Sequence, residues 1–217
     1  MVNKPLISII TTAYNEESIL PEYFDALSNV ISQLQHVNVE VLIINDGSTD
    51  QTLSFLKQKA DVSHPFRLRV VNFSRNFGKE SAMKAGFDYA NGDAAIIMDA
   101  DLEDPVELIP LMIDEWISGF DIVYTVRKIR VEGFFKCFFA TCFYKVINSF
   151  SDIHIYPNAG DYRLFDRKAI TALNRFGEKN RFSKGLFNWI GFKSTSLEYN
   201  RYARRKGSSK WSFSQLW

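Results

Sequence analysis

Short apolar runs alternate with amphipathic segments along the first 130 residues of the chain. The runs are rich in β-branched residues and predict strands that are buried on both faces. The segments between them carry the apolar spacing and the start signals of helices. The predicted strands are 6–14, a run from 39 that stops at Asn45-Asp46-Gly47, 68–74, 94–100 and 121–126; the predicted helices are 15–34, one capped by Ser48 or Thr49, 78–90 and 105–118.

This regular alternation predicts an α/β fold in which a mostly parallel, Rossmann-like sheet has helices on both faces. In such sheets, ligands bind outside the carboxyl ends of the strands. Four polar stretches fall at those predicted ends, namely Tyr14-Asn15, Asp46-Gly47, Ser74-Arg75 and Asp99 to Asp101. We therefore expect them to line one shared crevice.

The second half of the chain is less regular. Residues 133–150 have apolar side chains at helical spacing and a high density of Phe. This pattern favours a helix packed on the core, and the alternative is a helix that lies against lipid. Residues 160–170 predict a strand that enters a helix, and residues 194–199 predict another strand. The sequence contains no run of 18 apolar residues, so it predicts no membrane-spanning helix.

Charge is distributed unevenly along the chain. The net charge of the 217 residues is only +1, which gives no indication of a nucleic-acid partner. Residues 201–217 nevertheless hold five basic residues and no acidic one, so phosphate groups or a membrane surface are the expected partners of this tail. The two cysteines and three scattered histidines form no disulfide framework or metal-ligand pair, which fits a cytosolic protein.

Acidic residues crowd together directly after the strand at 94–98: Asp99, Asp101, Glu103 and Asp104 fall within six positions. Like charges this close repel one another, so we expect a positive partner. Carboxylate oxygens suit Mg²⁺ or Mn²⁺, which commonly complete their coordination with water and substrate phosphates. In the alternative interpretation, Asp99 caps a turn and the other acids are solvated.

Other strand ends support the functional interpretation. Asp46 provides a carboxylate that can accept hydrogen bonds from a base or ribose, and Arg75 and Lys79 follow the next strand. Taken separately, Asp46-Gly47 is a good turn and Arg75 a partner for a surface acid. Their location at consecutive strand ends favours a donor site that includes Lys79.

Six motifs occur in the order found in one family: TTAYNEE, VLIINDGSTDQT, NFSRNFGKESAMKAGFDYANGD, IIMDADLEDP, AGDYRLFDRKAI and RRKGSSKW. Together they resemble family-2 glycosyltransferases, and in particular the polyprenyl-phosphate branch, which includes dolichol-phosphate mannose synthases and bactoprenol glucosyltransferases. The resemblance implies a GT-A fold in one continuous catalytic domain. Residues 1–130 would form its nucleotide-sugar half, and residues 131–217 its acceptor half with an interfacial tail. Many members of this branch continue into membrane-spanning helices at about the point where this sequence stops.

The resemblance also implies roles for individual residues. Asp101 is expected to bind the metal ion, and Glu103, where the family often has Gln, supplies a further carboxylate ligand. Asp161 matches the acidic residue near the acceptor and, with Asp101, is the expected catalytic pair. The donor nucleotide or sugar is expected to contact Ala13, Tyr14, Asn15, Glu16, Asp46, Asp99 and Ala100, and the phosphates Arg204, or its neighbour Arg205, Ser209 and Lys210.

We therefore predict an inverting transfer of a hexose from a nucleotide diphosphate sugar to a polyprenyl (undecaprenyl or dolichyl) phosphate at the cytoplasmic face of the membrane. Uridine is the favoured nucleotide and guanosine the alternative, while the sugar and any homo-oligomer remain open. A lipid phosphate is already ionised, so Asp161 would orient it more than deprotonate it. Arg127, Lys128 or Arg130 would offset its charge, unless this basic run is a solvated loop.

Three alternatives remain. A soluble GT-A enzyme that acts on a carbohydrate or protein hydroxyl would share every motif before residue 127. A non-catalytic nucleotide-sugar binder would share the donor site but not depend on Asp101 and Asp161. A nucleotidyltransferase is disfavoured because TTAYNEES lacks the glycines expected after its first strand.

Overall fold

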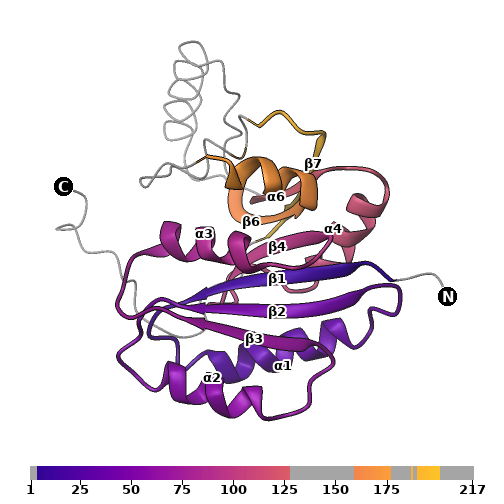
Figure 1. Ribbon diagram of the computed structural model, residues 1–217. Helices are drawn as coiled ribbons and strands as arrows, with labels where there is room; N and C mark the ends of the chain where they lie inside the picture. The colour runs from indigo at the N-terminus through magenta and orange to yellow at the C-terminus, as the bar shows by residue number, and fades with distance from the viewer. Residues whose placement is uncertain (1–3, 128–158, 177–186, 188–189, 201–217) are drawn as a thin grey trace, which may run out of the picture.

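A computed structural model describes residues 4–127, 159–176, 187 and 190–200 of the chain. Its described strands form a single seven-stranded sheet (Figure 1) with the order β3-β2-β1-β4-β6-β5-β7. The strands are β1 (Leu6–Ala13), β2 (Asn38–Asn45), β3 (Arg67–Asn72), β4 (Ala94–Asp99), β5 (Ile122–Arg127), β6 (Ala159–Asp166) and β7 (Ser194–Tyr199).

Strands β1 to β4 are parallel, and their carboxyl ends finish at the same level of the sheet. Ala13 at the end of β1 is opposite Asn45 at the end of β2, and Thr12 is opposite Asp99 at the end of β4. β3 ends with Asn72 opposite the same Asn45. The polar stretches that follow these strands therefore begin along one edge, as the sequence predicts.

Helices cover both faces of the sheet and bury two separate hydrophobic clusters. Figure 1 shows α1 (Leu20–Ile31) and α2 (Thr52–Ala60) on one side of the sheet, and α3 (Lys79–Tyr89) on the other. α4 (Leu108–Ile117) shares the core of α1 and α2, and α6 (Arg167–Asn174) shares that of α3. In α1 the buried positions recur every three or four residues, because only one stripe of a helix can face the sheet; they are Leu20, Tyr23, Phe24, Leu27 and Ile31.

β6 is the one described strand that runs against the others. It is inserted between β4 and β5 and pairs antiparallel with both. Its register places Arg163 opposite Ile97, so the strand brings Asp161 toward Asp99 at the end of β4. The mostly parallel sheet predicted from the sequence is confirmed, and this insertion adds a second acidic strand end to the same edge.

The helix starts predicted at Asn15 and at Ser48 or Thr49 are wrong, and the helix predicted from Pro105 begins three residues later, at Leu108. The helix predicted from Asn15 begins at Leu20, since residues 14–19 form a bend and a turn, and the N–H groups of Asn15 and Glu16 donate to side chains that follow β2. Neither Ser48 nor Thr49 caps α2, which begins at Thr52; the Ser48 hydroxyl instead donates a hydrogen bond to Asn45. The predicted helix at 133–150 and the basic tail at 201–217 lie outside the described residues.

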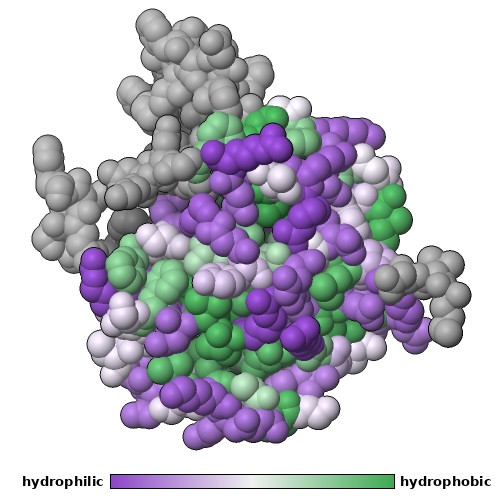
Figure 2. All heavy atoms as spheres, viewed as in Figure 1, coloured by the Kyte–Doolittle hydropathy of each residue, from purple (hydrophilic) through white to green (hydrophobic). Residues whose placement is uncertain are grey.

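Most side chains on the face shown in Figure 2 are hydrophilic, with hydrophobic residues visible between them. The large hydrophobic side chains that the structure exposes are few, as on ordinary protein surfaces; they are Val62, Phe77, Tyr89, and Leu111 and Ile117 of α4. Among the described helices, none has the length and apolar character needed to cross a membrane.

Candidate active site

The loops after β1 and β2 hold each other in place. The Asn15 backbone N–H donates to Ser48 Oγ at 2.9 Å, and the Thr49 N–H donates to Asn15 Oδ1 at 2.8 Å. One residue further on, the Glu16 N–H donates to Thr52 Oγ1 at 2.9 Å. Asn15 has a φ of +53°, a left-handed conformation that Asn tolerates better than most residues. The segment predicted to contact the nucleotide, Ala13 to Glu16, is thus fixed by side chains of the neighbouring loop.

Asp46 fixes the next loop along the same edge. Its side chain is only 4% exposed, and its two oxygens accept hydrogen bonds from the backbone N–H groups of Phe77 and Gly78, at 2.7 and 2.9 Å. The guanidinium of Arg75 stacks on the Phe77 ring at 4.2 Å. In the described residues Asp46 therefore organises the loop after β3, while its predicted contact with a base or ribose stays a prediction.

Lys79, the first residue of α3, joins the two acidic strand ends. Its ammonium Nζ lies 2.7 Å from Asp99 Oδ2 and 2.9 Å from Asp161 Oδ2, so one cation bridges β4 and β6. Burial alone would lower the pKa of Lys79, but the charges of Asp99 and Asp161 outweigh it and raise that pKa above its usual range. Lys79 is thus a positive partner for Asp99, the first acid of the cluster.

The acidic loop after β4 has a strained backbone. Leu102 has a φ of +55°, unusual for a residue with a branched side chain, and that side chain is buried in the core. Leu102 lies between Asp101 and Glu103, so its buried side chain fixes the loop between these two acids. The Glu103 N–H donates to Asp101 Oδ1 at 3.1 Å. Ala100, two residues before Leu102, is also buried.

The carboxylates of this loop suit a divalent ion as a ligand pair. No group of three or more His, Cys, Asp or Glu side chains gathers into a metal cage among the described residues. Mg²⁺ needs no such cage, since one or two carboxylates together with water and substrate phosphates suffice. The donor set of Asp101 and Glu103 therefore fits Mg²⁺ or Mn²⁺ bound jointly with a diphosphate.

Asp104, the last acid of the cluster, is buried and not solvated. It is 6% exposed, accepts a hydrogen bond from the Tyr199 hydroxyl, and lies 3.7 Å from the Arg127 guanidinium. Arg127 Nε in turn donates to the Tyr199 oxygen at 3.0 Å. Burial raises the pKa of Asp104, and burial together with Asp104 raises the pKa of Tyr199 to about 12. This Asp104–Tyr199–Arg127 cluster ties β5 and β7 to the acidic loop.

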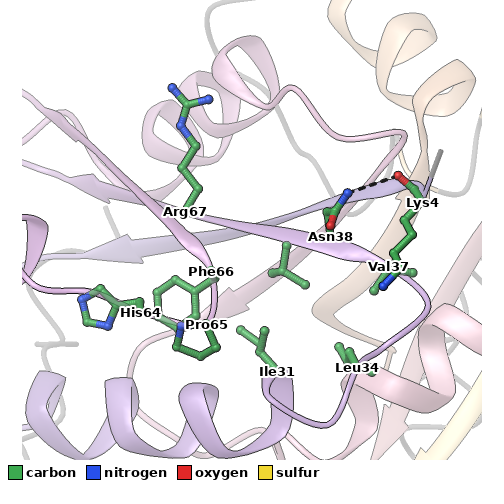
Figure 3. Close-up of a pocket in the computed structure, with 10 residues that line it drawn as sticks. Lys4, Ile31, Leu34, Val37, Asn38, His64, Pro65, Phe66 and Arg67 are labelled. Carbon is green, nitrogen blue, oxygen red and sulfur yellow. Dashed lines mark hydrogen bonds between the residues drawn. The ribbon is translucent and has the colours of Figure 1, made fainter. Parts of the chain in front are cut away.

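A cavity of about 360 Å³ lies away from these residues. Figure 3 shows Asn38 and Arg67, which begin β2 and β3, among its lining residues, with Lys4 just before β1. It is therefore at the amino ends of the strands, the opposite edge from Lys79. Because its floor is formed by core residues such as Ile31 and Phe66, we assign it no part in the chemistry.

The part of the chain that matches a known family contains most of the candidate site. A model of glycosyl transferase family 2 matches residues 8–173, which include every strand end described above except that of β7. The chain belongs to glycosyl transferase family 2. This membership confirms the family expected from the six motifs.

Relatives of this family 2 chain are similar over almost its whole length. An uncharacterized glycosyltransferase of Synechocystis sp. is 46% identical over 97% of this chain and 66% of its own. A prophage bactoprenol glucosyl transferase homolog of Escherichia coli is 39% identical over 97% of this chain and 68% of its own. The chain thus spans about two thirds of the length of the curated relatives it matches, with shares of 63% to 68%.

Solved structures confirm the fold of the family 2 chain. A mannosyltransferase of Pyrobaculum calidifontis, in complex with GDP-Man and Mn²⁺, superposes with a TM-score of 0.62 over 91% of this chain and 56% of the other. Its sequence identity is 19%, so this similarity bears on the fold alone. The GT-A type of α/β fold is confirmed.

Several residues of the family 2 site escaped sequence reasoning. Tyr162 donates from its hydroxyl to the Pro105 carbonyl at 3.0 Å, and Tyr199 holds Asp104. Both tyrosines lie in predicted strands, but only the antiparallel insertion of β6 and the pairing of β7 with β5 bring them to the acidic loop. Arg204, Ser209 and Lys210 lie outside the described residues, as do Lys128 and Arg130.

Proposed function

We propose that this family 2 chain transfers a hexose from a nucleotide diphosphate sugar to a polyprenyl phosphate at the cytoplasmic face of a membrane. The observation that carries the proposal is the bridge formed by Lys79 between Asp99 on the donor side and Asp161 on the acceptor side. Relatives named bactoprenol glucosyl transferase, such as the Escherichia coli homolog, support a polyprenyl phosphate acceptor.

The donor occupies the edge formed by the loops after β1, β2 and β4. Ala13 to Glu16 and Asp46 bind the nucleoside, uridine being the favoured base, and Asp99 and the Ala100 backbone contact the sugar diphosphate. Asp101 and Glu103 hold Mg²⁺ or Mn²⁺, which would stabilise the negative charge that the leaving nucleoside diphosphate acquires. Lys79 adds a fixed positive charge beside the same diphosphate.

The state of Asp161 favours a phosphate acceptor over a hydroxyl. A sugar hydroxyl must lose its proton to a nearby base as it attacks. A carboxylate already paired with an ammonium at 2.9 Å gives up that ion pair if it takes a proton, so Asp161 is a poor base in this arrangement. A lipid monophosphate is mostly ionised near neutral pH and needs no base.

The chemical step is then a direct displacement. A phosphate oxygen of the lipid forms a bond to the anomeric carbon, while the bond from that carbon to the diphosphate oxygen breaks and its electron pair leaves with the nucleoside diphosphate. Attack from the opposite side inverts the anomeric configuration. Arg127 offsets the acceptor's charge, and Arg204, Ser209 and Lys210 are proposed to hold phosphates.

A transfer assay with a radiolabelled donor tests this function. The purified chain would be incubated with labelled UDP-glucose, Mn²⁺ and either undecaprenyl phosphate in detergent or a soluble glycan, and the same reactions would be run with GDP-mannose. We expect the label to enter the lipid fraction, and to stay out of it with EDTA or with Asp101→Asn. Asp25→Asn, a change of an exposed acid on α1, serves as the control and should retain full activity.

Two results would contradict the proposal. If the label entered only the soluble glycan, the acceptor would be a hydroxyl and Asp161 would have to act as a base. If the chain bound the nucleotide sugar but transferred nothing to either acceptor, it would be a binding module.

A further inference from the structure

Tyr199 occupies the point where the acceptor side and the acidic loop meet. Its hydroxyl donates to the buried carboxylate of Asp104 and accepts from Arg127 Nε at 3.0 Å. Tyr199 is the last residue of β7 and is itself buried, so packing holds its ring in place. The Tyr199 oxygen thus contacts both Asp104, in the acidic loop after β4, and the guanidinium of Arg127 on β5.

Arg127 faces the acceptor side through its other nitrogens. A Cβ at Gly160, the residue before Asp161, would stand 3.7 Å from Arg127 Nη2, and the same Nη2 lies 3.7 Å from Asp104 Oδ1. The hydrogen bond to Tyr199 uses Nε, so Nη2, which lies near both Asp104 and Gly160, is not engaged by Tyr199. A planar guanidinium held this way is suited to bind a phosphate through the nitrogens at its end.

The acidic loop has a second tyrosine anchor that does not involve Arg127. The Tyr162 hydroxyl, also fully buried, donates to the Pro105 carbonyl at 3.0 Å. Tyr199 and Tyr162 therefore hold adjacent residues of the same loop from β7 and β6. In the described part of the chain, Tyr199 also accepts a hydrogen bond from Arg127, whereas the Tyr162 hydroxyl bonds to the Pro105 carbonyl, so the two tyrosines form a matched pair for experiment.

We propose that Tyr199 is a positioning residue that couples acceptor binding at Arg127 to donor binding at the acidic loop. An acceptor phosphate bound to Arg127 would stabilise the hydrogen bond that Nε already makes to the Tyr199 hydroxyl, and that hydroxyl holds Asp104 and the strained loop at Leu102 in the conformation that the donor complex requires. The ordering of Arg127 and of the loop is then shared by the two ligands, which makes each bind more tightly in the presence of the other. This inference rests on the proposed function.

A binding experiment without turnover measures the coupling. UDP and Mn²⁺ would be titrated calorimetrically into the wild-type chain, with and without saturating geranyl phosphate as a short soluble acceptor; GDP replaces UDP if the transfer assay selects a guanosine donor. We expect geranyl phosphate to tighten nucleotide binding by about 5-fold or more, the lower end of common coupling factors. In Tyr199→Phe this factor should fall to below about 2-fold.

Two further variants separate coupling from simple loss of structure. Tyr162→Phe removes the matched hydroxyl and should weaken nucleotide binding while it retains the wild-type coupling factor. Arg127→Lys keeps the charge but loses the Nε donor, and should lose coupling as Tyr199→Phe does. Thermal melting of each variant shows whether it is folded, and Arg127→Lys serves as the test if Tyr199→Phe is not.

The outcomes distinguish the inference from the function on which it rests. Coupling lost in Tyr199→Phe and kept in Tyr162→Phe supports it. Coupling that is absent from the wild type, kept in Tyr199→Phe, or lost equally in both variants overturns it, even though lipid transfer by the wild type would leave the proposed function standing. A wild-type chain that binds nucleotide but labels no lipid overturns the proposed function itself.

Discussion

Gly47 lies against the backbone of Arg75, and a Cβ at position 47 would stand 2.6 Å from Arg75 Cα. Gly47 also has a φ of +64°, which L-residues with a side chain adopt at a cost. Strain and overlap together should make Gly47→Ala less stable by about 3 kcal/mol. The shift of the Arg75 loop should also weaken nucleotide-sugar binding by roughly tenfold or more. Urea denaturation and a nucleotide titration measure the two effects.

Gly119 provides the matched control, because it has a φ of +96° but nothing lies within 4 Å of the position of its Cβ. It follows α4 at the far end of that helix from the acidic loop. Gly119→Ala should therefore lose only about 1 kcal/mol and keep its nucleotide affinity. Equal losses in the two variants would show that the close approach to Arg75 has no importance.

Gly86 of α3 packs directly on Ile10 of β1. A Cβ at position 86 would overlap Ile10 Cγ2 and stand 3.4 Å from Ile10 Cβ, so α3 approaches the sheet more closely than alanine allows. We expect Gly86→Ala to destabilise the chain by about 2 kcal/mol, although alanine is the better helix former. Leucine lacks the Cγ2 methyl group of isoleucine, so adding Ile10→Leu should recover part of the lost stability. A double-mutant cycle in urea with no interaction between the two positions would contradict this account.

The order of strands and helices was predictable because buried parallel strands and amphipathic helices have different periods. Residues 194–199 were predicted as a strand and form β7, and the helix predicted at 78–90 is α3, Lys79–Tyr89. Helix starts were harder, since Asn15 and Ser48 carry cap-type side chains but use them on each other's loops. Local preference gave way there to contacts between segments about 33 residues apart.

The acidic strand end and Lys79 were predictable as part of a site, but their pairing was not. The sequence places Asp99 and Asp161 62 positions apart, and only the antiparallel entry of β6 beside β4 makes them share one lysine. Asp104 looked like a fourth member of a solvated or metal-binding cluster. Its burial against Tyr199 depends on the register of β7 with β5, which no local pattern contains.

Glu40 lies at the edge of the sheet opposite the site, and it is expected to make the stability of the fold depend on pH. Its buried carboxylate accepts hydrogen bonds from the Ser8 hydroxyl at 2.6 Å, the Asn91 N–H at 2.8 Å and Arg69 at 3.2 Å. Burial by itself would raise the pKa of Glu40, but these hydrogen bonds and the Arg69 charge outweigh it and lower the pKa below its ordinary value of 4.5. The ionised form therefore stabilises the fold above that pH, and this contribution is lost as the pH falls through the lowered value.

Glu40→Gln should accordingly reduce the free energy of unfolding by about 2 kcal/mol at pH 7. The difference from the wild type should shrink in urea denaturations carried out progressively below pH 4.5. Asp25→Asn changes an exposed acid and should show no such difference at either pH. A Glu40→Gln penalty that stays constant down to pH 3 would mean that hydrogen-bond geometry, and not charge, accounts for it.

Lys79→Met is expected to leave the chain folded and remove most of its transfer activity. It deletes the ammonium that lies between Asp99 and Asp161, so the two carboxylates repel each other and the leaving diphosphate loses a fixed cation. We expect kcat to fall on the order of 100-fold. Lys84→Met on the same helix removes a surface ion pair with Asp88, and should change kcat by less than about twofold. Lys79→Arg keeps a charge and should retain an intermediate rate, because its longer, planar group would not reproduce the positions of the two short contacts that Nζ makes. If Lys79→Met kept the wild-type kcat in the lipid-transfer assay while Asp101→Asn lost it, the bridge would hold the strands together without acting on the reaction.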